Sequence, residues 1–529
     1  MTRKFIGFNI GSTSVGAIVY DYDRNEIVAK HKLPMVEVAA SVGVTVTEEE
    51  GMVENGKGNF VIPGIVIAKG AEMIIDTLAN DNSFANEEVL CGSNSFQGHL
   101  TAYLKQGVTQ VLQNPDPTTP LHQQLASFFT CDCPTWMNST TKEQTERLND
   151  LATKAGLNVI KMAERYPGPQ ILQRVGITAY DDASTIMCGN ALWAFLLTGV
   201  PSFSGPGDAA ASGFVNLETL KLDKDAMKLI APDLERKVAE VTPPGTIIGK
   251  VSPFFQRKGF VNMGMSTSDQ DNIKSGAYAI FRPDILQVSL GTSYTAYIVS
   301  KKTIAGFEGN FASNDAEYPY LLLLCKNNGS GSISGVLSMH HYSAKAFDKV
   351  TRSLRRSQPG NEGRMALPWF KPEIIPYAPH APGFVRNNYA KGFRADIRAA
   401  VEGNAASLLY AAREKFKDMV SITGVSFVGG AKQNPEIMKI WANMAGVDCY
   451  EMAMGEDAAA IGAALTAAAD YLRNQPETSS LKLTDVVSRF VEKHKPTVTT
   501  PDRDIAEMYR TKFMPAYVAF EAAHAQQRR

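Results

Sequence analysis

The sequence has no long uninterrupted run of apolar residues and no excess of charge of one sign. Its 529 residues include 53 Lys and Arg and 54 Asp and Glu, so the formal net charge is -1. This balance, without a long basic run, argues against nucleic acid or an anionic membrane as a main partner. No segment has the apolar length of a membrane-spanning helix, and we recognise no signal peptide. We therefore expect a cytoplasmic protein with no membrane association.

Cysteine is also scarce, with six residues scattered along the chain. Cys131 and Cys133 are separated by one residue and no second pair follows, so their spacing is not that of a structural zinc site. We expect reduced thiols and assign no residue as a metal ligand. A chain of 529 residues is too long for a single hydrophobic core, which predicts two or more domains.

The chain contains an internal repeat, because residues 9–21 (NIGSTSVGAIVYD) resemble residues 289–301 (SLGTSYTAYIVSK). Both stretches predict a strand, a turn of glycine and two hydroxyl residues, and a second strand, which suggests two similar domains. Such turns can hold a phosphate, and the two could face each other across a cleft. The alternative is a chance similarity between two short hairpins. The turn residues are Gly11, Ser12, Thr13, Gly291, Thr292 and Ser293.

A third feature is a strand-like GVSFV followed by GGAKQNPEIMKIWANMAG. Gly429 and Gly430 permit close approach of a ligand to the backbone. Asn434 is placed to cap a helix whose first residue is Pro435, and the N-terminus of that helix favours an anion or a polar ligand edge. A tight packing turn is the alternative interpretation. Residues 456–472, rich in Ala and Gly, predict a second helix that can pack close to a neighbour.

The remaining elements are less specific. Residues 70–81 predict a helix with one apolar face, and residues 141–157 predict another, capped by Thr141. Residues 204–213 (SGPGDAAASG) are typical of a loop. Residues 360–383 are rich in Pro and Gly and predict irregular surface chain.

Two Gly-hydroxyl hairpins and a later Gly-Gly strand-to-helix turn occur in the order of the phosphate, phosphate and adenosine motifs of the actin-like ATPase and sugar-kinase fold. On this order, and on LHQQL, CPTWMNSTTKEQ, AERYPGPQI, GFVNMGMSTSDQ and GGAKQNPEI, the chain resembles carbohydrate kinases of the FGGY family, and within it xylulokinases of the animal type. The resemblance covers nearly the whole chain. It implies an α/β fold with two ribonuclease-H-like domains flanking a nucleotide and sugar cleft. The implied parts are a sugar-binding domain at 1–258, a nucleotide-binding domain at 259–480, and a helical tail at 481–529 packed on the kinase core.

The resemblance also implies an activity, the ATP-dependent phosphorylation of a ketopentose, with D-xylulose converted to D-xylulose 5-phosphate. The cofactors would be ATP and Mg2+, the partner a small sugar, and a homodimer is compatible with it. Asp269 would accept the proton of the substrate hydroxyl as a general base. The resemblance assigns sugar contacts to Gln97, Gly98, Asn138, Arg165 and Gln270, and ATP contacts to Gly11, Ser12, Thr13, Gly291, Thr292, Ser293, Gly429, Gly430 and Asn434.

Asp271 competes with Asp269 for the role of base, because SDQDN can be shifted by two positions against the family pattern. We prefer Asp269, because Gly276 then falls where the family has its helix glycine. Either carboxylate could instead be a solvated or helix-capping group.

Four positions depart from the family pattern. Asn9 and Asn138 stand where Asp is usual, and the loss of charge at Asn9 should weaken a magnesium shell. Gln97 stands where related xylulokinases have a His that contacts the sugar, and His99 is displaced by two residues. Ser268 stands where Gly is usual. These changes leave two alternatives open: a catalytically impaired homologue that serves as a structural subunit of a larger assembly, and a kinase for another ketose or polyol.

Overall fold

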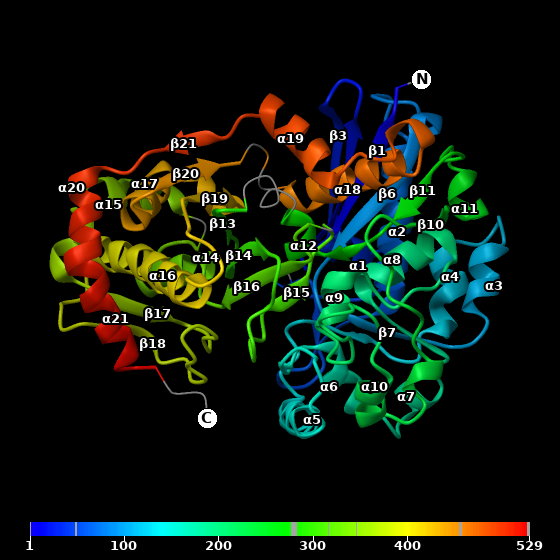
Figure 1. The fold of residues 1–529 in the computed structure, drawn as a ribbon, viewed down its shortest axis with the longest axis horizontal. Coiled ribbons are helices and arrows are strands. Elements are labelled where there is room, and N and C mark those ends of the chain that lie inside the picture. Colours follow the sequence, from blue (N-terminus) through cyan, green and yellow to red (C-terminus); the bar gives the residue numbers. More distant parts are fainter. Residues whose placement is uncertain are drawn as a thin grey trace. The chain divides into compact units, whose positions relative to one another are not determined.

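The computed structural model describes residues 2–47, 50–276, 283–315, 317–344, 346–452, 454 and 457–525. The chain forms two compact units (Figure 1), and each is built from three separate segments. Unit 1 comprises Met1–Phe281, Lys301–Leu321 and Ala459–Phe490, and unit 2 comprises Arg282–Ser300, Leu322–Ala458 and Val491–Arg529. The linear domain limits at 258 and 480 stay a prediction.

The sheet of unit 1 begins with the predicted strand-turn-strand motif. β1 pairs antiparallel with β2, β2 pairs antiparallel with β3, and β6 lies parallel to β1 on its other side. β11 and β12 are both parallel to β6, and β10 closes that edge. The strands are β1 (Lys4–Ile10), β2 (Ser14–Asp21), β3 (Glu26–Pro34), β6 (Val89–Phe96), β10 (Ile247–Lys250), β11 (Gly264–Ser266) and β12 (Asp269–Gln270).

Long helices cover this sheet. α2 (Gly64–Ala79) confirms the helix predicted at 70–81 and buries Ile74, Ile75 and Leu78. α18 (Ala458–Arg473) packs its small residues against β1, since a Cβ on Gly7 would lie 1.8 Å from the backbone oxygen of Ala460. α1 (Met35–Ala40) and α8 (Gly189–Thr198) also belong to this core.

Two local predictions in unit 1 are wrong. Thr141 occupies the N-cap of α5 (Lys142–Lys154), but its side chain accepts no capping hydrogen bond. Its hydroxyl donates to the backbone oxygen of Glu164. The segment predicted as a loop at 204–213 contains a buried helix, α9 (Pro206–Ala210).

Shorter elements complete unit 1. The helices are α3 (Val108–Gln113), α4 (Leu121–Leu125), α6 (Pro167–Leu172), α7 (Thr178–Asp181), α10 (Lys224–Ile230), α11 (Pro253–Gln256), α12 (Asp271–Ser275) and α19 (Leu483–Lys493), and the strands are β4 (Val53–Glu54), β5 (Phe60–Ile62), β7 (Thr101–Leu104), β8 (Cys133–Pro134), β9 (Thr185–Cys188) and β15 (Asn310–Ala312).

The sheet of unit 2 repeats the strand pattern of unit 1. β13 pairs antiparallel with β14 and parallel with β19, and β19 pairs parallel with β20. Among the strands assigned to unit 2, the order is β16-β14-β13-β19-β20-β21. Its strands are β13 (Ile285–Leu290), β14 (Tyr294–Ser300), β16 (Tyr320–Lys326), β19 (Gly424–Val428), β20 (Asp448–Glu451) and β21 (Thr497–Thr499). The internal repeat is thus confirmed, and so is the α/β fold of two ribonuclease-H-like domains.

The helices of unit 2 pack around the long α16 (Phe393–Phe416), which meets the closing helix α21 (Met514–Ala522). The buried Glu402 of α16 accepts hydrogen bonds from Arg398 at 2.6 Å and from Tyr509 at 2.5 Å, which fixes the C-terminal segment to this unit. The prediction of wholly irregular chain at 360–383 is wrong, because β17 (Ala366–Trp369) pairs with β18 (Gly383–Arg386). The other helices are α14 (Ser330–Met339), α15 (Phe347–Arg355), α17 (Pro435–Ala445) and α20 (Arg503–Met508).

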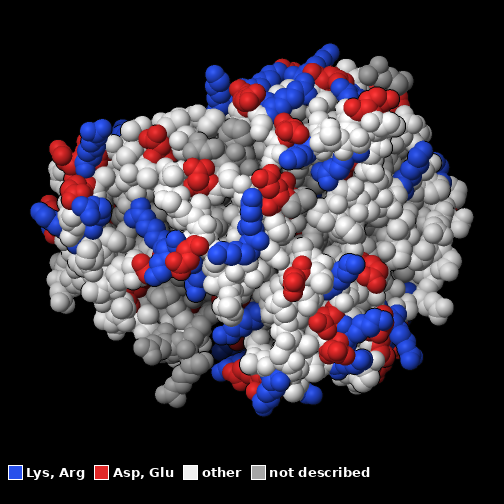
Figure 2. Space-filling model, in the orientation of Figure 1, with Lys and Arg blue, Asp and Glu red and all other residues white. Residues whose placement is uncertain are grey.

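Figure 2 shows Lys and Arg side chains interspersed with Asp and Glu on the face that it displays, without a field of one sign over the described residues. Among the described residues, no helix combines the length and the apolar character that crossing a bilayer requires.

Candidate active site

Asp269 lies at the end of the unit 1 sheet, and three backbone groups hold its carboxylate. β12 pairs with the end of β6, with Asp269 beside Ser95. The N–H of Gly207 donates to Oδ2 at 2.8 Å, and the N–H groups of Asp208 and Gln270 donate to Oδ1 at 2.9 and 2.8 Å. A carboxylate offers about four lone-pair sites, so Oδ2 keeps one for a further donor.

The electrostatic setting of Asp269 suits proton transfer near neutral pH. Burial raises the pKa of this carboxyl to about 7, while the charge of Lys274 and the backbone hydrogen bonds oppose that rise. General bases work best when their pKa lies close to the working pH. Asp269 has no accessible surface in this structure, so a substrate hydroxyl must displace a neighbouring group to reach Oδ2.

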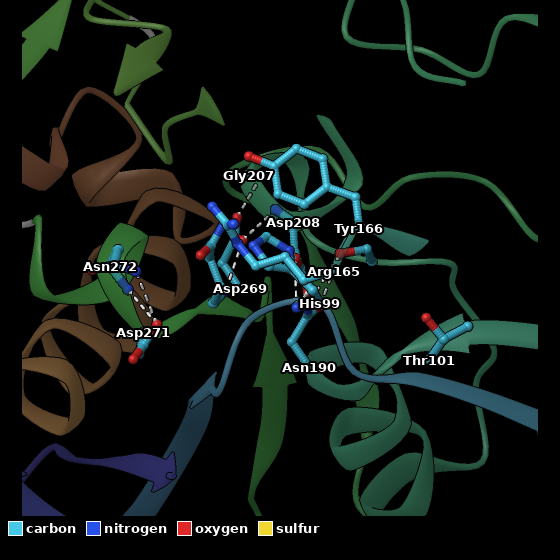
Figure 3. Close-up of polar contacts among 12 residues, drawn as sticks. His99, Thr101, Arg165, Tyr166, Asn190, Gly207, Asp208, Asp269, Asp271 and Asn272 are labelled. Atoms are coloured by element: carbon cyan, nitrogen blue, oxygen red, sulfur yellow. Dashed lines mark hydrogen bonds and ion pairs between the residues drawn. The ribbon is translucent and has the colours of Figure 1, made fainter. Parts of the chain in front are cut away.

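Two backbone N–H groups of helix α9 bind the Asp269 carboxylate. The sequence did not predict this helix. Gly205 and Gly207 make the close approach feasible, since a Cβ on either would lie within 3.0 Å of the Asp269 carboxylate. The side chain of Asp208, the next residue, faces His99 and accepts a hydrogen bond from its Nδ1 at 2.8 Å (Figure 3). Pro206 after a Ser-Gly pair, a common start for a helix, was the signal that could have revealed α9.

Asp271, the competing candidate, lies in a different setting. It is the first residue of α12, and its Oδ1 accepts hydrogen bonds from the N–H of Asn272 at 2.9 Å and from its side chain at 3.2 Å. Figure 3 shows it directed away from the group formed by Asp269, Asp208 and His99. Desolvation raises the pKa of Asp271 to about 6. Asp271 does not cap α12, because the N-cap residue is Gln270 and no side chain makes a capping hydrogen bond there, and the choice of base stays a prediction.

Two glutamines predicted to contact the sugar end in unpaired amide groups. Nε2 of Gln97 and Nε2 of Gln270 are buried and have no hydrogen-bond partner among the described residues. Gln97 follows the last residue of β6, and Gln270 is the last residue of β12, paired with Phe96. A Cβ on Gly98 would lie 2.9 Å from Oε1 of Gln270. A buried unpaired donor costs about 1–3 kcal/mol, so these amides indicate a polar ligand.

Arg165 comes from the segment before α6. Its guanidinium lies 5.4 Å from the centre of the Tyr166 ring, and its backbone oxygen accepts a hydrogen bond from Gln170 at 2.8 Å. The ring of Tyr166, the next residue, lies 4.6 Å from the ring of His99 between centroids. The predicted contact of Arg165 with the sugar stays a prediction.

The two asparagines that replace aspartates have different surroundings. Asn9 lies in β1, and its Oδ1 accepts a hydrogen bond from Ser95 at 3.1 Å. Asn138 is buried in a loop, where its Oδ1 accepts hydrogen bonds from the N–H and the hydroxyl of Thr140. Its amide donates to Asn59 at 3.2 Å. These contacts give Asn138 a role in holding the loop, and its predicted sugar contact stays a prediction.

The first predicted phosphate turn, Gly11 to Thr13, connects β1 and β2. The Ser12 hydroxyl donates to Gln97 at 3.1 Å and accepts a hydrogen bond from the indole of Trp136 at 3.1 Å. Thr13 is exposed, and the N–H groups of Ser12 and Thr13 have no hydrogen-bond partner among the described residues. Such N–H groups suit a phosphate oxygen.

The second predicted turn, Gly291 to Ser293, connects β13 and β14. Thr292 is exposed, and the N–H groups of Thr292 and Ser293 also have no hydrogen-bond partner among the described residues. The carbonyls of Gly291 and Thr292 accept hydrogen bonds from the N–H groups of Ser330 and Gly331, at 3.0 and 3.1 Å.

The Gly-Gly turn lies in unit 2 after β19. Gly429 has a φ of 90°, and a Cβ there would approach the backbone of Leu290 to 2.9 Å. Gly430 has open space where a Cβ would be. Asn434 caps α17 as predicted, accepting from the N–H of Glu436 at 3.1 Å, and Pro435 is the first helical residue. Contacts of these residues with a nucleotide stay a prediction.

The residues fit a magnesium ion only in a limited way. Within the described ranges, no group of three or more His, Cys, Asp or Glu side chains is arranged to hold a metal ion. Mg2+ in phosphoryl-transfer sites keeps several waters and needs only one or two carboxylates besides the phosphates. Asn9 has a neutral amide at the strand end beside the first turn, so an ion bound mainly through phosphates and water fits this chain.

Comparisons with known proteins agree with this architecture. Residues 286–471 match the sequence model of the FGGY family of carbohydrate kinases, C-terminal domain. The chain is 26% identical over 503 residues to xylulose kinase 2 of Arabidopsis thaliana, covering 89% of this chain and 88% of that protein. It is 27% identical over 404 residues to the xylulose kinase of Mus musculus, covering 73% of this chain and 72% of that protein.

Solved structures show the same fold. A ligand-bound xylulose kinase from Lactobacillus acidophilus superposes with a TM-score of 0.79 at 17% identity, covering 98% of both chains. A glycerol kinase from Plasmodium falciparum with ADP gives a TM-score of 0.75 at 14% identity, covering 100% of this chain and 99% of that one.

The fold is that of two-domain sugar kinases, and the duplicated turns agree with it. Residues 286–471 match the C-terminal domain of the FGGY family of carbohydrate kinases, and the chain is similar to xylulose kinases over most of its length. The family resemblance seen in the sequence is confirmed.

Proposed function

We propose that this chain phosphorylates a ketopentose with ATP, and that its substrate is D-xylulose, converted to D-xylulose 5-phosphate. The observation that carries the proposal is Asp269: a buried carboxylate fixed by three backbone N–H groups, with its pKa raised to about 7 and a lone-pair site left on Oδ2. The names of the similar proteins supply the substrate. They lend no support to the alternative of an impaired homologue with a structural role.

In the proposed reaction, Oδ2 of Asp269 takes the proton of the primary hydroxyl of the sugar as that oxygen bonds to the γ-phosphorus, and the bond to the ADP oxygen breaks. The free amides of Gln97 and Gln270, with Arg165, orient the sugar hydroxyls. Phosphoryl transfer depends mainly on positioning and charge neutralisation. The N–H groups of the two turns bind phosphate oxygens, and a bound Mg2+ would neutralise further phosphate charge.

The test measures ADP release with Mg-ATP and a panel of ketopentoses and polyols. Asp269→Asn should lower the sugar-dependent rate by about 10²–10⁴-fold, the usual contribution of a general base. Asp271→Asn is the matched control: Asn can accept the same hydrogen bonds from Asn272, so most of the rate should remain.

Each outcome of this assay has a defined meaning. Absence of sugar-dependent turnover in a folded wild-type sample would overturn the kinase proposal. A large loss in the Asp271 variant, with activity kept in the Asp269 variant, would move the base to Asp271. A better rate with another sugar would replace D-xylulose as the substrate.

A further inference from the structure

Asn190, the second residue of α8, is buried, and its amide binds the segment around α9. Its Oδ1 accepts hydrogen bonds from the N–H of Gly205 at 3.0 Å and from the hydroxyl of Ser268 at 3.4 Å. Its Nδ2 donates to Oδ2 of Asp208 at 3.1 Å and to the Ser204 hydroxyl at 3.0 Å. An amide offers two acceptor and two donor positions, so each of the four has a partner.

These partners determine which way the amide faces. The N–H of Gly205 only donates and therefore requires the oxygen of Asn190. The ionised carboxylate of Asp208 only accepts and therefore requires the nitrogen. An aspartate has the same shape as asparagine, but it could satisfy only Gly205. The site is thus built for a side chain that both donates and accepts.

The same contacts join α9 to the strand of the proposed base. Gly205 is the N-cap of α9, and a Cβ there would lie 1.7 Å from the backbone oxygen of Ser268, the residue before β12. The N–H groups of Gly207 and Asp208 in α9 donate to the Asp269 carboxylate (Figure 3). Ser268 stands where the family usually has glycine, and its hydroxyl adds a bond between the strand of the base and the same amide.

From this geometry we infer that Asn190 is the positioning residue of the proposed base. Its amide holds the start of α9 and Ser268 together. The N–H groups of Gly207 and Asp208 are thereby kept within hydrogen-bond distance of the carboxylate that they bind. Asn190 acts through α9, so its role needs no contact with the sugar or with ATP. The inference rests on the proposed function, because it concerns the part that Asp269 plays in that reaction.

Position and charge must be distinguished, because both affect Asp269. Burial raises the pKa of this carboxyl to about 7, and the charge of Asp208 adds to the rise. Lys274 and the backbone N–H groups of Gly207 and Gln270 oppose it. A second carboxylate at position 190 would raise this pKa further and slow the reaction mainly at low pH. A displaced α9 would slow the reaction even at pH 9, where Asp269 is ionised.

The experiment exchanges donor and acceptor across the pair formed by Asn190 and Asp208. Asn190→Asp leaves Asp208 facing a second carboxylate, and Asp208→Asn leaves Asn190 facing a second amide nitrogen. The double variant restores the hydrogen bond with its direction reversed. It also keeps an oxygen for the N–H and the Nδ1 of His99, which both bind Oδ1 of Asp208 in the wild type.

The readouts are kcat and KM with D-xylulose and Mg-ATP at pH 9. Each single variant should lower kcat about 10- to 100-fold, because a misplacement of about 1 Å can cost 10²-fold, and should leave the KM for ATP unchanged. The double variant should regain most of that loss. Asn328→Asp is the matched control, since it places a carboxylate against the buried Glu373 of unit 2, and it should keep most of the wild-type kcat.

Hydrogen exchange of the peptide that contains Gly207 and Asp208 reports their N–H bonds without turnover. Exchange should be faster in both single variants and should return toward the wild-type rate in the double variant. Faster exchange with an unchanged kcat, or a folded double variant that stays as slow in turnover as the single variants, would overturn the inference. If the single variants do not fold, a folded double variant with the wild-type kcat supports it. The expected exchange pattern without sugar-dependent turnover in wild type would count against the kinase proposal and leave the placement of α9 by Asn190 standing.

Discussion

The two Gly-hydroxyl turns share a backbone design and differ in what surrounds them. Each turn follows a strand that has one antiparallel and one parallel neighbour, and each leaves two N–H groups without a partner in the described part of the chain. Around the first turn, Ser12 is tied to Gln97 and to Trp136. Around the second, the carbonyls are tied to the start of α14. The N–H groups that both turns share suit a phosphate oxygen. Any difference in what the two turns do must therefore come from the residues around them.

Both units bury charged side chains, and unit 2 pairs the buried Lys326 with Glu373 at 3.1 Å. Unit 1 places Asp269, Lys274 and Asp470 in its interior, and burial raises the pKa of Asp470 to about 6 and lowers that of Lys274 to about 8. Unit 2 places Gly429 and Gly430 at its strand-to-helix turn, where no side chain stands between the backbone and a ligand. The proposed base therefore lies in unit 1, and a nucleotide contact at Gly429 and Gly430 in unit 2 stays a prediction.

The largest expected effect comes from adding a side chain at Gly429, where the backbone of unit 2 passes close to Leu290. Gly429→Ala should destabilise the protein by about 1–3 kcal/mol, the usual cost of a side chain in a glycine-only conformation, and should raise the KM for ATP. Gly430→Ala, one residue on, meets nothing within 4 Å and should change the free energy of unfolding by about 0.5 kcal/mol or less. Denaturant unfolding and ATP titration measure both. Equal destabilisation by the two variants would contradict the assignment of the close approach to Gly429.

The next largest effect concerns the ionisation of Asp269 in unit 1. Because the pKa of Asp269 is raised to about 7 and the carboxylate is the active form, the rate should fall about tenfold per pH unit well below pH 7. Lys274 opposes the rise in that pKa, and its ammonium donates to the backbone oxygen of Thr267 at 2.7 Å. Lys274→Met should therefore raise the pKa of Asp269 and move the acid limb of the pH–rate profile upward.

Rates measured from pH 5.5 to pH 9 distinguish the loss of the Lys274 charge from a disturbance of the structure in Lys274→Met. The deficit of Lys274→Met should be largest near pH 6 and should shrink at pH 9, where Asp269 is ionised in both proteins. A deficit that is the same at every pH, in a sample with a lowered melting temperature, would mean that Lys274 only holds the segment of Thr267.

Local patterns predicted the parts of this molecule that local chemistry determines. The hairpin turns, α2 and the cap of α17 at Asn434 depend on residues within a few positions of one another. The close contact of α18 with Gly7 followed from small residues whose helix position was visible in the sequence.

The parts that were missed depend on partners far away in the chain. Helix α9 has five residues, too few for a periodic pattern, and it is anchored by Asp269 from 61 positions away. His99 meets Asp208 across 109 positions, so its sequence neighbours give no sign of the imidazole's orientation. The hydroxyl of Thr141 donates to the carbonyl of Glu164, 23 positions away, a contact that the local cap pattern does not reveal.

The smallest expected effect comes from adding a carboxylate to the strand that leads into the first turn. Asn9 stands at the end of β1, and Ser289 stands at the corresponding position of β13, so neither turn has a carboxylate on the strand that leads into it. Asn9→Asp keeps the hydrogen bond from Ser95, because Asp also accepts it. An added negative charge near a divalent ion at the surface is worth about 1 kcal/mol. The Mg2+ concentration for half-maximal rate should therefore fall about fivefold.

Asn138→Asp is the control for that change, because it adds the same charge in a loop held by Thr140 and Asn59. It should leave the Mg2+ dependence unchanged while Asn9→Asp lowers it, both read from ADP release at fixed ATP. An equal shift in both variants would mean a general effect of charge on the protein. No shift in either would mean that the ion is held by phosphates and water alone, and that Asn9 serves the strand end through its bond to Ser95.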